Sequence, residues 1–354
     1  MIAPNIAGEA GELAFAEKTS GTRYLGLQWI RIIACLMVLW FHGTLYIRSE
    51  HFPVYYRGAV GVDLFFVLSG FVIVVSSRRL AGLASGWKTF AKHRVLRVVP
   101  MYWLITTLNL ILLAVAARAH GLPHPNGVWV LCSYLFVPYH SAALEPGPVL
   151  GVGWTLEFEM LFYALCTAVL AARRKLLPYA YVPLVLLAVG SVWRAHFSQE
   201  IFRFLDPVVL EFGFGMFIAH RCIRKQHLPA ALAWSLAFGA TILLFYWPWP
   251  HVHGFMVATG IPAAVLIYAT ASLEHRLPRT PRWVLVCADA TYLLYLIHVP
   301  ILLEISKAAG RHHMRYGEAA IAIGVLLSAG IAIVLRIAVE APLLRWLQPE
   351  RRRA

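Results

Sequence analysis

The sequence predicts an all-α integral membrane protein, a bundle of about ten transmembrane helices with both chain termini in the cytoplasm. Of its 354 residues, 60% are hydrophobic and only 14% are charged, whereas soluble domains contain about 45–50% apolar and about 25% charged residues. The apolar excess runs through most of the chain, and the basic residues gather in alternate connecting segments. A soluble domain with a single membrane anchor is therefore excluded.

Ten hydrophobic runs are long enough to cross a bilayer, which takes about 17–25 apolar residues in a helix. These runs lie near residues 26–46, 60–77, 98–118, 154–172, 177–194, 203–221, 230–248, 253–272, 283–304 and 317–340. A weaker stretch, 128–138, is too short to span, so we expect it to be re-entrant or interfacial.

The distribution of basic residues predicts the orientation of the bundle. With both termini in the cytoplasm, 21 of the 31 Lys and Arg residues lie in segments on the inside and 7 lie on the outside, as the positive-inside rule requires. The outer 305–316 loop runs against this rule. The net charge of +14 thus reflects membrane topology. No nucleic-acid-binding motif accompanies it, so we expect the lipid bilayer and no nucleic acid as a partner.

Three parts of the chain follow from this pattern. Residues 1–24 are polar and lack the order of a signal peptide, so they predict a mobile cytoplasmic tail. Residues 25–345 form the transmembrane domain, and residues 346–354 form a basic cytoplasmic tail. The five cysteines fall mostly inside apolar runs without paired spacing, which indicates neither disulfides nor a metal site.

Two residues of the first span are out of place on a lipid-facing helix. Arg31 and His42 bound the stretch RIIACLMVLWFH and are eleven positions apart, which puts them on one helix face about 16.5 Å apart along the axis. Taken singly, Arg31 could extend to the headgroups and His42 could cap the outer helix end. Together on one face, they indicate a polar cavity inside the bundle.

The second span offers a partner for this histidine. The segment GVDLFF places Asp63 near the start of the helix, at a depth comparable to His42 because the first two helices form a hairpin. A carboxylate there could accept the second N–H of the imidazole and fix its tautomer. Alternatively, Asp63 is an acid favoured by the dipole at a helix start.

Other ionisable residues lie within later spans. Glu157 and Glu159 point about 200° apart on a helix, so at least one of them should face the interior. His298 lies well inside the ninth span and Glu340 lies at the inner end of the tenth. Both could be structural.

A basic segment precedes the third span. Arg94 and Arg97 share one helix face just before Pro100. With Lys88 and Lys92 they would form a cytoplasmic cationic cluster suited to phosphates. Arginines next to the membrane are, however, also what the positive-inside rule predicts.

Taken in order, these segments resemble the acyltransferase 3 family of bacterial membrane O-acyltransferases. Six motifs carry the resemblance, namely LQWIRIIACLMVLWFHG, GVDLFFVLSGFVI, RVLRVVPMYW, WTLEFEMLFY, YLLYLIHVP and VEAPLL. The resemblance covers residues 25–345 and implies an acyltransferase domain of the stand-alone type, without a fused esterase-like domain. In the family pattern Glu159, rather than Glu157, holds the key acidic position.

The resemblance implies transfer of an acyl group, most often acetyl, from cytoplasmic acyl-CoA to a hydroxyl of a sugar, polysaccharide or lipid-linked glycan at the outer side of the bacterial cytoplasmic membrane. The coenzyme A thioester is then the donor substrate, and no metal is required. Arg94 and Arg97, with Lys88 or Lys92, would hold the phosphates of the coenzyme. Arg31 would steady the pantetheine arm or the thioester.

The resemblance also implies roles in the transfer step. His42 would act as general base toward the acceptor hydroxyl or would carry the acyl group transiently. Asp63 would orient the imidazole ring, and Glu159 would serve as a second acid or as an acceptor-binding group.

Two other classes of protein remain as alternatives. Intramembrane His, Asp, Glu and Arg also build the proton relays of transporters and flippases, although the chain shows no inverted repeat of the kind many transporters have. A structural subunit of a polysaccharide export complex is the second alternative.

Overall fold

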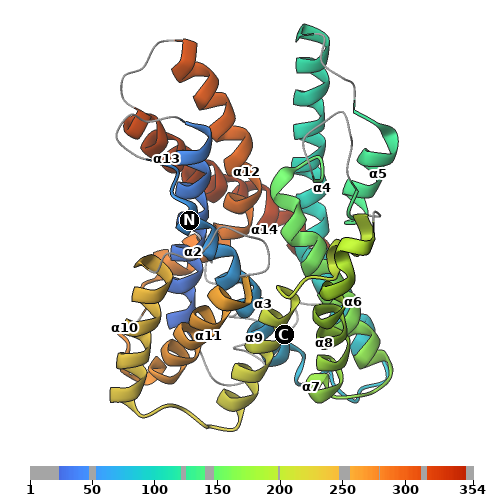
Figure 1. Ribbon diagram of the computed structural model, residues 1–354, viewed down its shortest axis with the longest axis vertical. Helices are drawn as coiled ribbons and strands as arrows, with labels where there is room; N and C mark the ends of the chain where they lie inside the picture. Colours follow the sequence, from blue (N-terminus) through green and yellow to red (C-terminus); the bar gives the residue numbers. More distant parts are fainter. Residues whose placement is uncertain are drawn as a thin grey trace, which may run out of the picture.

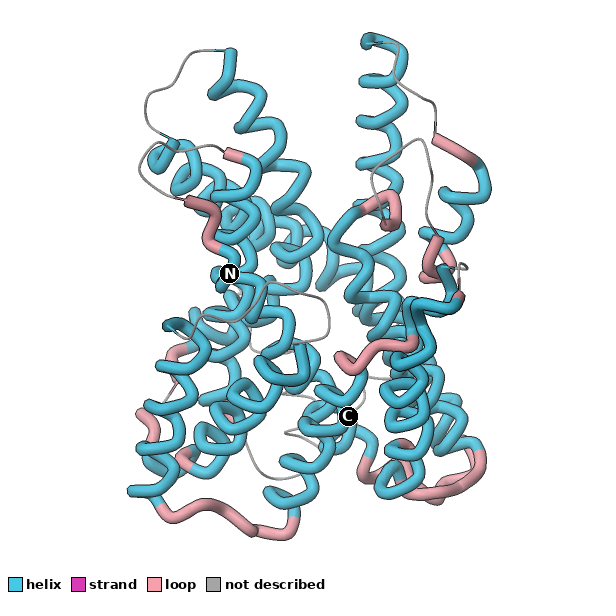
Figure 2. Tube along the Cα trace, viewed as in Figure 1, coloured by secondary structure: helices cyan, strands magenta, loops and turns pink. Residues whose placement is uncertain are grey.

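The computed structural model describes residues 24–47, 53–120, 125–139, 147–197, 200–246, 256–278, 280–311 and 317–347. Within these residues the chain consists of helices and connecting loops without a strand (Figure 2). The predicted tails, residues 1–24 and 346–354, fall almost entirely outside the described residues.

The helices follow one another along the chain as Figure 1 labels them. They are α2 (Gly26–Tyr46), α3 (Gly61–Ser77), α4 (Gly86–His120), α5 (Gly127–Tyr134), α6 (Trp154–Ala171), α7 (Leu176–Tyr179), α8 (Tyr181–Gly190), α9 (Val209–Ile223), α10 (Ala230–Tyr246), α11 (Met256–Ser272), α12 (Arg282–Arg311), α13 (Gly317–Leu335) and α14 (Ala341–Leu347). A π turn, Arg336–Glu340, joins α13 to α14.

Six helical segments of the described chain are long and apolar enough to cross a membrane. They are Gly26–Tyr46, Tyr56–Ser77, Gly86–Ala119, Gly151–Ala171, Arg282–Ala309 and Gly317–Leu347. Two shorter apolar helices, Ala230–Tyr246 and Thr259–Ser272, accompany them. The all-α membrane class is therefore confirmed, whereas the count of ten spans is not.

The shortfall is clearest in the runs predicted at 177–194 and 203–221. The first folds as α7, α8 and a 3-10 turn, Ser191–His196, and the second begins with another 3-10 turn, Glu200–Phe204, ahead of α9. Proline cannot continue a helix without loss of a backbone hydrogen bond, and Pro178, Pro183 and Pro207 lie in these runs. Apolar composition therefore predicted that these segments are helical, but it did not predict the length of each helix.

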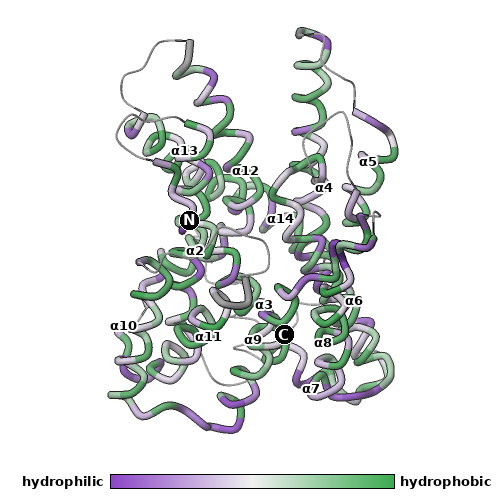
Figure 3. The backbone as a smooth tube through the Cα atoms, viewed as in Figure 1, coloured by the Kyte–Doolittle hydropathy of each residue, from purple (hydrophilic) through white to green (hydrophobic). Residues whose placement is uncertain are grey.

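The outer surface of the bundle is apolar. Large hydrophobic side chains are exposed on the outer helices, including Leu186 on α8, Phe238 on α10 and Leu326 on α13. Figure 3 shows hydrophobic residues along these helices and hydrophilic residues on the loop between α9 and α10. Such exposed apolar surface is suited to lipid rather than water.

Helix α3 is the most buried of the candidate spans and packs most extensively against α9. Figure 1 shows these two helices between the α10–α11 pair on one side and α6 and α8 on the other. Gly70 and Gly215 allow the close approach, because a Cβ atom at Gly70 would overlap the carbonyl oxygen of Phe212 and one at Gly215 would overlap that of Val67.

We expect Gly215→Ala to lower the free energy of unfolding by about 1–3 kcal/mol, because the added methyl group forces α3 and α9 apart. Gly239→Ala in α10 is the matched control, since no atom lies within 4 Å of a Cβ built there and alanine is favoured over glycine in a helix by about 0.5–1 kcal/mol. Thermal unfolding of both variants in detergent checks this prediction. Equal stability of the two variants would contradict it.

Helix α4 differs from the prediction at its start. The sequence predicted a cytoplasmic segment at 78–97 and a span beginning at 98, but α4 already begins at Gly86 and continues through Pro100. Arg94 and Arg97 therefore belong to the same helix as the span. Both side chains point into the bundle, since Arg94 is buried and Arg97 lines an internal cavity.

Candidate functional site

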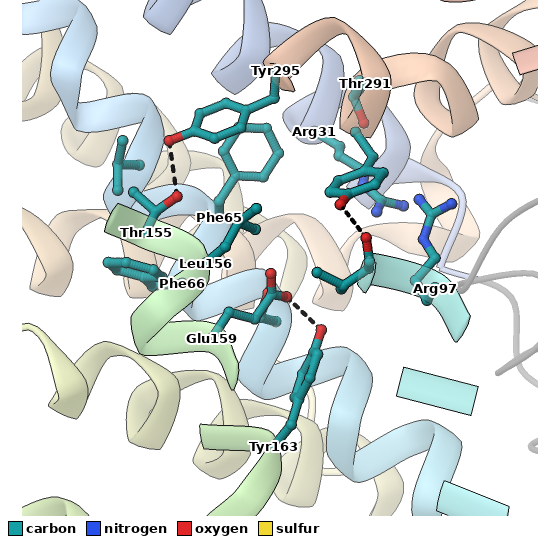
Figure 4. A pocket seen from close by; sticks show the side chains of 14 residues that line it. Arg31, Phe65, Phe66, Arg97, Thr155, Leu156, Glu159, Tyr163, Thr291 and Tyr295 are labelled. Atoms are coloured by element: carbon teal, nitrogen blue, oxygen red, sulfur yellow. Dashed lines mark hydrogen bonds between the residues drawn. The ribbon is translucent and has the colours of Figure 1, made fainter. Parts of the chain in front are cut away.

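A cavity of about 90 Å³ lies inside the bundle where α2, α3, α4, α6 and α12 meet. Figure 4 shows its lining. The polar lining residues are Arg31, Ser69, Arg97, Thr155, Glu159, Tyr163, Thr291, Tyr292 and Tyr295, and the apolar ones are Val62, Phe65, Phe66, Val98 and Leu156.

Helical spacing explains why these side chains converge. The α3 residues Val62, Phe65, Phe66 and Ser69 follow the i, i+3, i+4, i+7 pattern of a single helix face. On α6, successive turns bring Thr155, Glu159 and Tyr163 to the cavity, and α12 contributes Thr291, Tyr292 and Tyr295. The cavity is thus built on rigid helices rather than on loops.

Glu159 provides the one carboxylate among the described residues that line the cavity. It accepts hydrogen bonds from the hydroxyl groups of Ser69, at 3.0 Å, and Tyr163. The prediction that at least one of the two α6 acids faces the interior is therefore confirmed, and Glu159 is the one that lines the cavity. Glu157 is also buried, at 2% exposure, but it does not line the cavity.

Two arginines face this cavity from the side opposite Thr155 and Tyr295. Figure 4 shows the guanidinium groups of Arg31 and Arg97 next to each other there. Arg31 lies on α2 and Arg97 on α4, although the sequence predicted Arg97 in a cytoplasmic segment before the span. They give one side of a small buried cavity a positive charge.

Arg97 is held by a buried ionic network. Its Nη1 lies 2.6 Å from Oε1 of Glu340, so this carboxylate forms an ion pair with Arg97. The other carboxylate oxygen of Glu340 lies 3.8 Å from Nε of Arg336, and Arg336 also contacts Asp289 at 3.4 Å. Glu340 ends the π turn, a feature that is often found at functional sites.

The predicted cationic cluster of α4 divides into two parts. Arg94 is buried, at 4% exposure, and donates to Oγ of Ser76 at 2.7 Å. Lys88 and Lys92 are exposed. The four side chains therefore do not form the one cationic cluster that the sequence predicted, because the lysines, four residues apart, share the exposed helix face, whereas Arg94 and Arg97 share the face turned to the bundle.

His42 lies against a second histidine. Its Nδ1 is 3.1 Å from Nε2 of His298, and the two ring centres are 4.9 Å apart. His42 is partly buried and does not itself line the cavity, but His298 follows one turn after Tyr295, which does. The ring centres of Tyr295 and His298 are 5.7 Å apart.

Asp63 is not the partner of His42. Its Oδ1 accepts a hydrogen bond from Thr259 of α11 at 2.6 Å, and its other neighbour is the fully buried Glu211 of α9. The predicted orientation of the imidazole by Asp63 is therefore corrected. Comparable depth in the membrane did not bring the two side chains together, because Asp63 lies on the face of α3 that contacts α9 and α11.

We expect Asp63→Asn to retain the fold and most of the acyl transfer that the sequence resemblance implies. Two neighbouring buried carboxyl groups are stable when one keeps its proton and donates it to the other. Here Glu211 is the donor and Asp63 the acceptor, and the side-chain carbonyl of an asparagine can still accept hydrogen bonds from Thr259 and Glu211. Asp63→Leu removes the acceptor of Thr259 and should cost about 1–3 kcal/mol. Thermal unfolding and acyl transfer of both variants check this. A folded but inactive Asp63→Asn would instead assign Asp63 to the transfer step.

His298 is the functional candidate whose role the sequence did not reveal. It was interpreted as a possible structural histidine, but it is fully buried and continues the face of α12 that carries Thr291 and Tyr295. The spacing i, i+4, i+7 of these three residues is the signal that could have found it.

Comparisons with known proteins identify the family to which the chain is similar. A family model described as an acyltransferase domain matches residues 24–341. The exopolysaccharide production protein ExoZ of Rhizobium meliloti (strain 1021) is 34% identical over 310 residues, which cover 84% of this chain and 92% of that protein. No solved structure matches the chain.

Proposed function

The chain belongs to the acyltransferase 3 family of multi-pass membrane proteins, and we propose that it transfers an acetyl group from acetyl-CoA to a hydroxyl group of an exopolysaccharide or of its lipid-linked precursor. The reaction would take place in the bacterial cytoplasmic membrane, with the donor entering from the cytoplasm and the acceptor from the outer side. The observation that carries this proposal is the buried cavity that combines Arg31, Arg97 and Glu159.

The cavity suits a thioester in charge and in size. Guanidinium groups are good donors to carbonyl and phosphate oxygens, so Arg31 and Arg97 would bind the thioester carbonyl or the pantetheine arm. An engineered protein cavity of about 150 Å³ binds benzene. A cavity of about 90 Å³ therefore favours a short acyl group over a long chain.

The phosphates of the coenzyme require cations that reach water. The exposed Lys88 and Lys92 at the start of α4 meet this requirement. Arg94 is buried against Ser76, so we assign it to holding α4 against α3 instead. In this revised assignment, Lys88 and Lys92 would bind the phosphates of the coenzyme, and Arg97 would bind the thioester end of the donor.

His42 would be the general base or the transient acyl carrier. As a base, its imidazole takes the proton of the acceptor hydroxyl while the oxygen attacks the thioester carbonyl, the C–S bond breaks, and the proton passes to the departing sulfur. Because His42 contacts His298, the neighbour of the cavity-lining Tyr295, the donor would have to pass this tyrosine to reach the imidazole. Glu159 would bind a hydroxyl group of the acceptor or act as a second acid.

Purified full-length protein in nanodiscs tests the proposal directly. Acetyl-CoA is supplied together with the surface polysaccharide isolated from cells that lack the protein. We expect release of free coenzyme A thiol and the appearance of acetyl esters on the polysaccharide, detected by mass spectrometry and NMR. Butyryl-CoA should be a poorer donor if the cavity sets the acyl length.

Two results would overturn the proposal. Unchanged acetyl-CoA together with an unmodified polysaccharide excludes acyl transfer. Movement of a glycan or small molecule across the membrane of proteoliposomes without thioester cleavage would favour the transporter or flippase considered from the sequence.

A further inference from the structure

The contact between His42 and His298 joins α2 to α12, helices that lie far apart in the sequence. Neither ring is close to a carboxylate in any hydrogen bond of the described residues. No carboxylate therefore fixes the tautomers of the two rings. Instead, the neighbouring backbone carbonyl oxygens determine which ring nitrogens carry a hydrogen atom and which carry a lone pair.

The protonated nitrogen of His298 follows from its neighbours. Nδ1 lies 2.7 Å from the carbonyl oxygen of Tyr295 and 3.2 Å from that of Leu294. Carbonyl oxygens only accept hydrogen bonds, so Nδ1 carries a hydrogen atom. In a neutral imidazole the other nitrogen is then an acceptor. Nε2 of His298 therefore presents its lone pair to His42.

The same reasoning fixes His42. Its Nδ1 lies 3.0 Å from the carbonyl oxygen of Val38 and 3.1 Å from Nε2 of His298. Both neighbours are acceptors, so Nδ1 of His42 carries the hydrogen and shares it between them. The lone pair of the ring is then on Nε2, which makes no hydrogen bond within the described part of the chain.

We propose that His298 is a positioning residue that holds His42 in the Nδ1–H tautomer and so keeps the lone pair on Nε2 available for the reaction. This inference rests on the proposed function. When Nε2 takes the proton of the acceptor hydroxyl, the resulting imidazolium still donates from Nδ1 to His298 and Val38. The hydroxyl oxygen forms the new ester bond, the C–S bond breaks, and the proton moves from Nε2 to the sulfur. A neutral histidine thus takes the place that the sequence assigned to Asp63.

Two substitutions of His298 separate positioning from packing. His298→Phe keeps a ring of similar size but offers no acceptor, whereas His298→Gln can place an amide oxygen near the position of Nε2. We expect His298→Phe to lower kcat about 10²-fold with an unchanged KM for acetyl-CoA. His298→Gln should recover most of kcat, and both variants should unfold at temperatures close to that of the parent protein.

A second measurement does not depend on activity. The ¹⁵N chemical shifts of the histidine rings, assigned by comparison with a His42→Gln sample, report which nitrogen of His42 is protonated. We expect the Nδ1–H tautomer in the parent protein and in His298→Gln, and a mixture of tautomers in His298→Phe.

The outcomes distinguish the two proposals. Full kcat in His298→Phe, or equal losses in the folded Phe and Gln variants, would overturn the role of His298, as would an unchanged His42 tautomer in His298→Phe. If the parent protein fails to cleave acetyl-CoA while His298→Phe still changes the tautomer of His42, the proposed function is overturned and the role of His298 is not.

Discussion

Replacement of His42 by alanine is expected to lower acyl transfer about 10²–10⁴-fold, the range typical for loss of a general base. The expected loss follows from the position of the ring, which ends a chain of hydrogen bonds from the Tyr295 carbonyl through His298 and leaves Nε2 without a partner among the described residues. Release of thiol from acetyl-CoA in nanodiscs, with the polysaccharide as acceptor, measures the effect.

His220→Ala is the matched control for this variant. His220 is a partly buried helical histidine on α9 that lines neither the cavity nor the His42–His298 pair. We expect it to retain normal transfer, and both variants to keep the unfolding temperature of the parent. Near-normal transfer by folded His42→Ala would remove His42 from the chemistry and direct attention to Glu159, the carboxylate inside the cavity.

The base and the acyl carrier differ in their kinetics. A carrier forms an acyl-enzyme, so acetyl-CoA alone should give a burst of thiol equal to the protein present. A base should give no burst without an acceptor. Acid quenching of the protein with labelled acetyl-CoA, followed by peptide mapping, shows whether the label stays on the segment that contains His42.

Much of the fold could be predicted from composition, because only a membrane protein carries so many apolar runs. Helix ends were harder to predict. The apolar run at 177–194 was predicted as one span, but it forms α7, α8 and a 3-10 turn. Pro183 accounts for the break between α7 and α8, because it has no amide hydrogen for the carbonyl of Tyr179. Conversely, α4 begins at Gly86, in the basic segment before Pro100. Tertiary packing makes these residues helical, although their hydropathy assigned them to a loop.

The candidate site divides in the same way. Arg31 and Glu159 were predicted from their chemical cost in lipid, whereas Arg97 was predicted as part of a cytoplasmic basic cluster; the structure brings all three to one cavity. The Asp63–His42 pair failed because depth along the membrane normal does not specify a helix face. Residues Val62, Phe65, Phe66 and Ser69 form the cavity face of α3, and Asp63 shares the other face with Gly70, seven residues later, which contacts α9.

The ionic network behind Arg97 has the second-largest expected effect. Glu340 is 1% exposed at its side chain and receives both Arg97 and Arg336. Removal of one partner from a buried ion pair costs about 3–5 kcal/mol, because the remaining charges keep their desolvation penalty without the compensating attraction. We therefore expect Glu340→Gln to lower the free energy of unfolding by this amount.

Glu304→Gln provides the control for that substitution. Glu304 forms an ion pair of similar length with Lys307, at 2.6 Å, but both side chains are 58% exposed, and exposed pairs contribute only about 0–1 kcal/mol. The two variants make the same chemical change, so the difference between their thermal unfolding curves isolates the effect of burial. Since Arg97 also faces the cavity, Glu340→Gln should raise the KM for acetyl-CoA as well, and Glu304→Gln should not. Equal, small effects of the two substitutions would mean that Arg97 keeps its position through its contact with the Tyr292 ring, 5.3 Å away, and that the buried carboxylate does not determine the shape of the donor site.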